Sequence, residues 1–152
     1  GIQALDLLFR KIPLDGGKAI SKLFSEMEST VSEVEKLENF DHLSKTLKFH
    51  IKELKNVTES ITSLLIDGDL ADASGSATPF LKMFGQVLGG HYMGKALVKA
   101  HKKFTESNDE FYKDKITLSK FYIEQLLPLA SGYKDAVKSG SKDLFKIKSD
   151  SF

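Results

Sequence analysis

The sequence predicts an all-α protein: an up-and-down four-helix bundle preceded by a short N-terminal helix. Over almost the whole chain of 152 residues, apolar residues recur with the 3.6-residue period of an α-helix. No segment alternates apolar and polar residues for long, as a half-buried strand would. Three prolines, at positions 13, 79 and 128, and a few turn-forming segments divide the chain into helical stretches with short connections. An antiparallel bundle is the simplest arrangement for such stretches.

The first elements are a short helix and a long one. The apolar-rich segment from Gly1 to Leu8 predicts the short helix. Pro13 and the segment 15–17 (Asp-Gly-Gly) predict a turn that starts the next helix. This long helix buries one stripe of apolar residues: Ile20, Leu23, Phe24, Met27, Val31, Val34 and Leu37.

The second long helix begins after a break at 39–41, where Asp41 is the predicted N-cap. Asp67, Gly68 and Asp69 end it, because glycine tolerates the left-handed conformation of a helix C-terminus. Its apolar stripe is Leu43, Leu47, Ile51, Leu54, Val57, Ile61, Leu64 and Leu65.

The third long helix is predicted from about Ala77 to Phe104, with Pro79 in its first turn. One face carries Phe80, Phe84, Val87, His91 and Val98, and nearly the opposite face carries Gly85, Gly89, Ala96 and Ala100. A glycine inside a helix costs about 1 kcal/mol relative to alanine. We therefore expect another backbone to approach this helix closely, and we expect the helix to be the most buried element.

The last helix follows an interruption at 106–108 and starts at Asp109. Pro128 lies inside its apolar pattern and predicts a kink or a break. Gly140 closes the last turn, and residues 146–152 are expected to fray.

Composition limits the possible functions. Apolar residues make up 41% and charged residues 28%, as in ordinary soluble domains, and the net charge is +1. Such a balance favours neither nucleic acid nor an anionic membrane as a partner. The absence of cysteine excludes disulfides, thiolate metal sites and cysteine nucleophiles, and it favours a cytoplasmic location. No apolar run approaches the ~20 residues of a membrane span.

The residues themselves indicate no chemistry. His91 and His101 lack the convergent ligands of a metal site, so His91 is predicted to be a structural histidine in or near the core. A lysine strip on the third helix is predicted to be a solvated face, with a docking strip for an acidic partner as the alternative. The strip consists of Lys95, Lys99, Lys102 and Lys103. A set of helix-spaced aromatics is predicted to lie in the core: Phe80, Phe84, Tyr92, Phe104, Phe111, Tyr112, Phe121 and Tyr122.

Two stretches resemble acyl-CoA dehydrogenases. The segment from Gly1 to Leu8, with Arg10 and Lys11, is similar to the segment that follows the Tyr-Glu-Gly-Thr motif of that family. A second set of residues resembles the extra C-terminal helical domain of its methylmercaptopropionyl-CoA dehydrogenase-like subgroup. This set consists of Phe80, Leu81, Phe84, Gly85, Ala96, Ala100, Phe111, Tyr112, Lys115, Phe121, Tyr122, Leu126, Leu127 and Pro128.

The resemblance implies a parent enzyme that binds FAD and oxidises an acyl-CoA to the 2,3-enoyl-CoA, passing electrons to an acceptor. The catalytic glutamate belongs just upstream of Gly1, and Gln3 is the one residue matched to a position near the FAD. The chain starts without methionine, which predicts a piece of a longer polypeptide. Residues 1–12 would end the catalytic core, and 13–152 would form a non-catalytic C-terminal bundle. That bundle would pack on the core, help to shape the acyl entrance or assist assembly of a homo-oligomer.

Two alternatives from other functional classes remain open. The first is a stand-alone helical interaction module, whose glycine and alanine stripe receives a partner helix. The second is a lipid-binding bundle with an internal cavity lined by Phe80, Phe84 and Tyr122.

Overall fold

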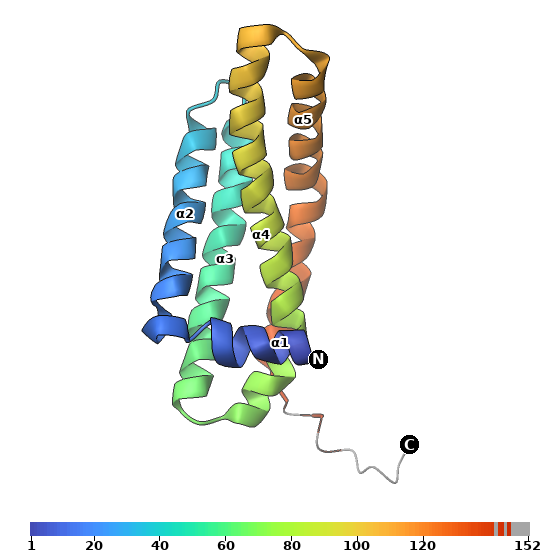
Figure 1. Cartoon of the computed structure of the whole chain (residues 1–152). Helices are drawn as coiled ribbons and strands as arrows, with labels where there is room; N and C mark the ends of the chain where they lie inside the picture. The colour runs from blue at the N-terminus through green and yellow to red at the C-terminus, as the bar shows by residue number, and fades with distance from the viewer. Residues whose placement is uncertain (142, 145, 147–152) are drawn as a thin grey trace.

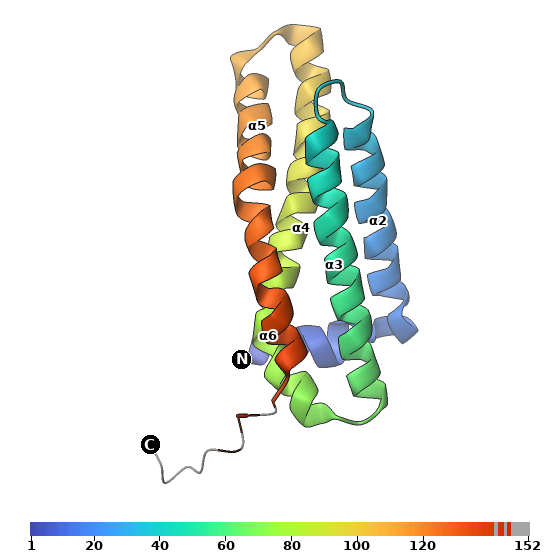
Figure 2. The ribbon, with the colours of Figure 1, turned by 180° about the vertical axis from the view of Figure 1, so that it is seen from behind.

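The computed structural model describes residues 1–141, 143, 144 and 146, and all regular structure in this part of the chain is helical. Long helical rods stand side by side, and the N-terminal helix crosses them near one end (Figure 1). The view from behind shows that the same rods pack around one another as a bundle (Figure 2). The predicted fold class is thus confirmed. Of the segment predicted to fray, 146–152, all but Lys146 lies outside the described residues.

The N-terminal crossing segment combines helix α1 (Ile2–Asp6) with a π-helical turn, η1 (Leu7–Lys11). Ala4, Leu8 and Ile12, spaced four residues apart, are buried against the bundle. A 3-10 turn, η2 (Leu14–Gly17), then reverses the chain with positive φ angles at positions 15, 16 and 17. The predicted turn between the first two helices is therefore confirmed.

Helices α2 (Lys18–Glu35) and α3 (Asp41–Ile66) form an antiparallel pair. The predicted cap at Asp41 is wrong by one residue, because Phe40 occupies the N-cap position and Asp41 is the first helical residue. Its carboxylate lies 2.5 Å from the Lys45 ammonium one turn later, so it forms a side-chain ion pair. Gly68, with φ +79°, follows α3, as the sequence predicts.

Helix α4 (Leu70–Ser107) starts seven residues before the predicted Ala77, so Pro79 lies well inside it and not in its first turn. The Asp69 side chain caps the new start by accepting a hydrogen bond from Asp72 N at 3.2 Å. The early turns persist because they are packed: Ser76 is fully buried and donates a 2.6 Å hydrogen bond to the carbonyl of Val137. This tertiary packing outweighs the low helix propensity of the Ser-Gly-Ser segment.

Helix α4 lies at the centre of the fold and contacts α1, α2, α3 and α5, together with the last short helix of the described residues, at 134–139. It carries a larger set of buried residues than any other described element, which confirms its predicted burial. Phe80, Phe84, Val87 and His91 are buried on the predicted face, and Val98 is partly buried there.

The predicted close approach of a backbone to the Gly85 face of α4 is wrong. A Cβ atom at Gly85 would meet nothing within 4 Å, whereas one at Gly89 would lie 2.2 Å from the Tyr122 hydroxyl. Backbone approaches α4 at Gly75, where a Cβ would lie 2.8 Å from the carbonyl carbon of Gly140. The sequence shows which residues of α4 are small and which face they share. It cannot show which neighbouring residue fills the space beside each one.

The last rod consists of four segments: α5 (Glu110–Phe121), the π-helical η3 (Tyr122–Leu126), the 3-10 helix η4 (Leu127–Tyr133) and α6 (Lys134–Ser139). Asp109 caps α5 by accepting from Phe111 N at 2.9 Å. Pro128 lies at the start of η4, so the predicted break is confirmed as a change of helix type. Gly140, with φ +60°, ends α6.

Side chains bind α4 to the last rod where its helix geometry is irregular. The Tyr122 hydroxyl donates to the carbonyl of Gln86 at 3.0 Å, and the Gln86 amide donates to the carbonyl of Leu126 at 2.5 Å. Farther along, Asp72 accepts from the backbone N–H and the hydroxyl of Ser141 at 2.8 and 2.6 Å. These bonds satisfy backbone groups at the π and 3-10 turns and at the end of α6.

Gly89→Leu should destabilise the bundle by ~1–3 kcal/mol or more, because the Tyr122 ring would have to move and lose its bond to Gln86. Gly89→Ala should act in the same direction. The matched change Gly85→Ala, at an open position of the same helix, should be neutral or stabilising by up to about 1 kcal/mol. Urea unfolding measures all three, and equal effects at positions 85 and 89 would contradict this account.

Candidate functional site

The outer face of the N-terminal helical segment is an exposed apolar surface. Ile2, Leu5 and Phe9, spaced three and four residues apart, share one side of α1 and η1. They are 86%, 40% and 38% exposed, while Ala4 and Leu8 on the inner side are at most 2% exposed. The apolar surface of this segment is thus wider than the stripe that the bundle buries, and its exposed part adjoins that stripe.

Charged side chains border this apolar face. The guanidinium of Arg10 forms two bonds with the Asp6 carboxylate, at 2.5 and 2.9 Å, and Lys11 lies 3.9 Å from the same group. The hydrogen bond from Arg10 lowers the pKa of Asp6. Because the Asp6 carboxylate balances the charge of Arg10 within the helix, only the charge of Lys11 remains beside this apolar surface.

Gln3 is exposed on α1. Its amide could contact a ligand held by another part of a protein. Gln3 does not line the groove described below, whose residues come from η2, α2, α3 and the segment 12–13. A contact between Gln3 and FAD therefore stays a prediction.

Two histidines, His50 and His91, are buried, as expected of residues with a structural role. His91 is 1% exposed and His50 is 4% exposed, and within the described part of the chain neither Nδ1 atom has a hydrogen-bond partner. Burial lowers the pKa of both imidazoles. Residues 1–141, 143, 144 and 146 contain no cluster of three His, Cys, Asp or Glu that could hold a metal ion. His101 packs edge to face against the Phe40 ring at 5.6 Å.

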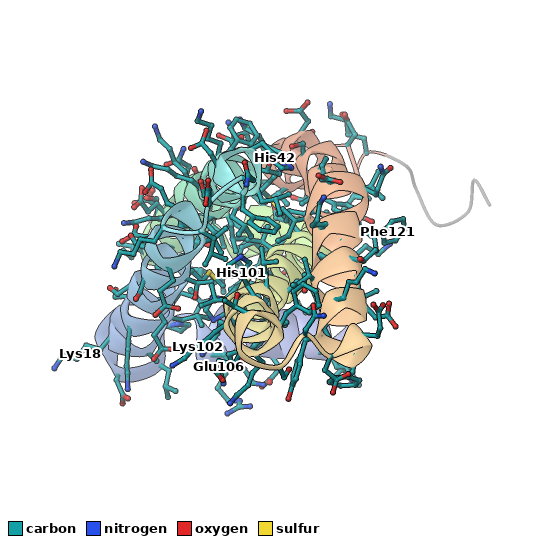
Figure 3. All side chains as sticks on the ribbon, turned by 90° about the horizontal axis from the view of Figure 1, so that it is seen from above. Lys18, His42, His101, Lys102, Glu106 and Phe121 are labelled. Atoms are coloured by element: carbon teal, nitrogen blue, oxygen red, sulfur yellow. The ribbon has the colours of Figure 1, made fainter. Side chains whose placement is uncertain are left out.

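The lysine strip of α4 is exposed at all four positions, as expected of a solvated face. Lys103 forms an ion pair with Glu106 at 3.1 Å. Viewed along the bundle, Lys102 and Glu106 point away from the helices (Figure 3). Binding of an acidic partner to this strip stays a prediction.

The prediction that the helix-spaced aromatics lie in the core is wrong for three of them. Tyr92, Phe111 and Phe121 are 57%, 57% and 52% exposed, and Phe121 points outward in Figure 3. Phe80 and Phe84 are buried, and the remaining three are partly buried. Helix α5 carries aromatics on more than one side, so spacing could not tell which side faces the bundle.

Sequence reasoning missed a groove between α2 and α3, with a volume of about 710 Å³. A smaller hollow of about 420 Å³ shares Glu28, Lys55 and Glu59 with it. Small hydroxyl residues line the larger groove, including Ser21 and Ser25, which lie one turn apart on α2. That spacing is visible in the sequence, but it marks a groove only once the opposite wall on α3 is known.

The fold and surfaces define the class of protein: an all-α bundle with a partly exposed apolar N-terminal segment across it. The family model of the acetyl-CoA dehydrogenase C-terminal-like domain matches residues 23–148. The chain therefore belongs to this family, and the resemblance to a C-terminal acyl-CoA dehydrogenase domain is confirmed at that level. The search of curated proteins found no match. Across the described residues, none of the helices combines the length and the apolar character needed to cross a membrane.

Acidification should destabilise the protein through its buried histidines. Their folded-state pKa values lie below the ordinary 6.5. The unfolded chain therefore binds more protons than the folded one as the pH falls through about 6.5 towards those values, and stability is lost over that window. Urea unfolding at pH 7.5 and 5.5 should show this loss, and the variants His50→Met and His91→Met should show less of it. An unchanged pH dependence in both variants would contradict the assignment.

Proposed function

We propose that this chain is the C-terminal helical domain of an FAD-dependent acyl-CoA dehydrogenase, with a structural or assembly role and no catalysis of its own. The family match over residues 23–148 supports the class of parent enzyme. The exposed apolar residues of α1 and η1 support the mode of attachment. The methylmercaptopropionyl-CoA dehydrogenase-like subgroup is the proposed branch.

The outer face of α1 and η1 is the observation that carries this proposal. A helix whose apolar surface is wider than the stripe its own bundle covers is suited to contact a second layer of protein. The bundle is the inner layer, and we propose that the catalytic core of the same polypeptide is the outer one. The matched region starts at residue 23, after η1, which supports a boundary near residue 12 between the core (1–12) and the bundle (13–152).

The chemistry would belong to the parent enzyme. It would oxidise an acyl-CoA to the 2,3-enoyl-CoA in fatty acid metabolism, with its glutamate base just before Gly1. FAD would accept the hydride and pass electrons to an acceptor. In the parent enzyme, Gln3 would reach towards the flavin from α1. A homo-oligomer in the cytoplasm is the proposed state of the parent.

A stand-alone interaction module is the second candidate, favoured by the exposed residues Phe111, Leu118 and Phe121 on α5. Exposed apolar stripes of this kind often mark protein contacts. The coding sequence upstream of residue 1 separates the two candidates, because the first requires a catalytic core there and the second does not.

Leu5→Lys and Phe9→Lys, made in the polypeptide encoded by the whole gene, should loosen the bundle from the core. Each change replaces an apolar side chain at the proposed contact between bundle and core by a charged one. Full burial of such an apolar side chain is worth about 1.5–3 kcal/mol. Calorimetry should show one unfolding transition splitting into two, and limited proteolysis should release the bundle. Phe49→Lys is the matched control, because Phe49 is 54% exposed on α3 and away from this face.

The 152-residue chain alone should neither retain FAD nor oxidise an acyl-CoA with an artificial acceptor. Tight flavin binding or turnover by the isolated chain would contradict the non-catalytic role. Equal effects of the Phe9 and Phe49 variants would contradict the proposed attachment face.

A further inference from the structure

We propose that the groove between α2 and α3 binds a linear amphiphile: an apolar chain that carries a cationic, hydrogen-bond-donating head. The groove volume of about 710 Å³ falls in the range of small-molecule sites. Its walls come from α2 and α3, and the turn residues Pro13, Gly16 and Gly17 border it. This inference does not depend on the identity of the parent enzyme.

The apolar part of the lining would hold the chain. Ile12, Ile20 and Phe24 line the groove beside the η2 turn, and Ile66 from the end of α3 also lines it. Ile66 is 80% exposed, so a bound alkyl chain would cover apolar surface that water now covers. Burial of that surface supplies a driving force proportional to its area.

The hydroxyl groups of the groove present acceptors. Ser25, Thr58 and Thr62 each donate to the carbonyl of the residue four positions earlier, at 3.1, 2.8 and 2.8 Å. Ser63 does the same towards Glu59 at 3.2 Å. Since these protons are engaged within their own helices, the oxygens offer lone pairs to the groove. A ligand that donates hydrogen bonds therefore fits the groove better than one that accepts them.

The charged side chains of the groove also favour a cationic ligand. Glu28 and Glu59 line the groove, and Lys55 is the cation that lines it with them. The Lys55 ammonium already lies 3.4 Å from Glu28. A cationic head near Glu59 would gain a charge-assisted bond, whereas an anionic head would face two carboxylates and one engaged ammonium.

A protein helix fits the groove less well. An amphipathic partner helix would continue into the adjoining hollow, which is lined by charged residues such as Glu35, Lys48 and Lys52. Apolar positions of that helix would have to cover these charges at a desolvation cost. Only one part of the groove has an apolar lining, and the charged residues lie in the rest. This division suits a ligand with a single alkyl chain and one polar head.

The test compares n-decylammonium with n-decanoate, which have the same chain length and opposite heads. Both are titrated into the 152-residue protein below their micelle-forming concentrations, with calorimetry for affinity and NMR shift mapping for location. We expect decylammonium to bind at least about tenfold more tightly. The shifts should fall on residues of α2 and α3 around Phe24 and Thr62. Glu59→Gln should reduce the preference between the two heads.

Ser63→Phe should abolish binding by filling the groove, and Ser60→Phe is its matched control. Both serines are exposed on α3 and donate to the carbonyl four residues earlier, but Ser60 does not line the groove. Circular dichroism checks that both variants remain folded. No binding, equal affinity for the two heads, a preference for decanoate, or equal effects of the two serine variants would each overturn the proposal.

Discussion

The close packing of α4 against its neighbours is the constraint on which the rest of the structure depends. In the middle of α4, a Cβ at Gly90 would lie 3.0 Å from Leu127, and one at Gly94 would lie 2.9 Å from Thr30. Missing side chains on α4 thus let residues from α2 and η4 enter. Each glycine costs about 1 kcal/mol in helix propensity, and the apolar surface buried around it offsets that cost.

The last rod can follow α4 only because its irregular turns are stabilised by side chains. A proline removes a backbone donor, and a π turn shifts the register of the helix. Here the bonds among Tyr122, Gln86 and Leu126 tie the irregular region to α4. The contact between Asp72 and Ser141 does the same at the end of α6. Pro128 therefore redirects the rod without separating it from the bundle.

The two surfaces of interest lie on different elements and have different physical character. The outer face of α1 is apolar and is bordered by the ion pair of Asp6 and Arg10, which suits a large protein contact. The groove between α2 and α3 combines an apolar part with hydroxyl and carboxylate acceptors, which suits a small donor ligand.

The sequence alone determined the fold class, most helix boundaries, the buried face around His91 and the break at Pro128, because periodicity and turn chemistry are local properties. Tertiary structure decided how far α4 extends, since its first turns depend on a bond between Ser76 and Val137, 61 residues apart. It also decided that Phe121 is exposed and that small hydroxyl residues form a groove. A helix carries its pattern along one axis, but burial depends on which neighbour covers each side, and that neighbour comes from elsewhere in the chain.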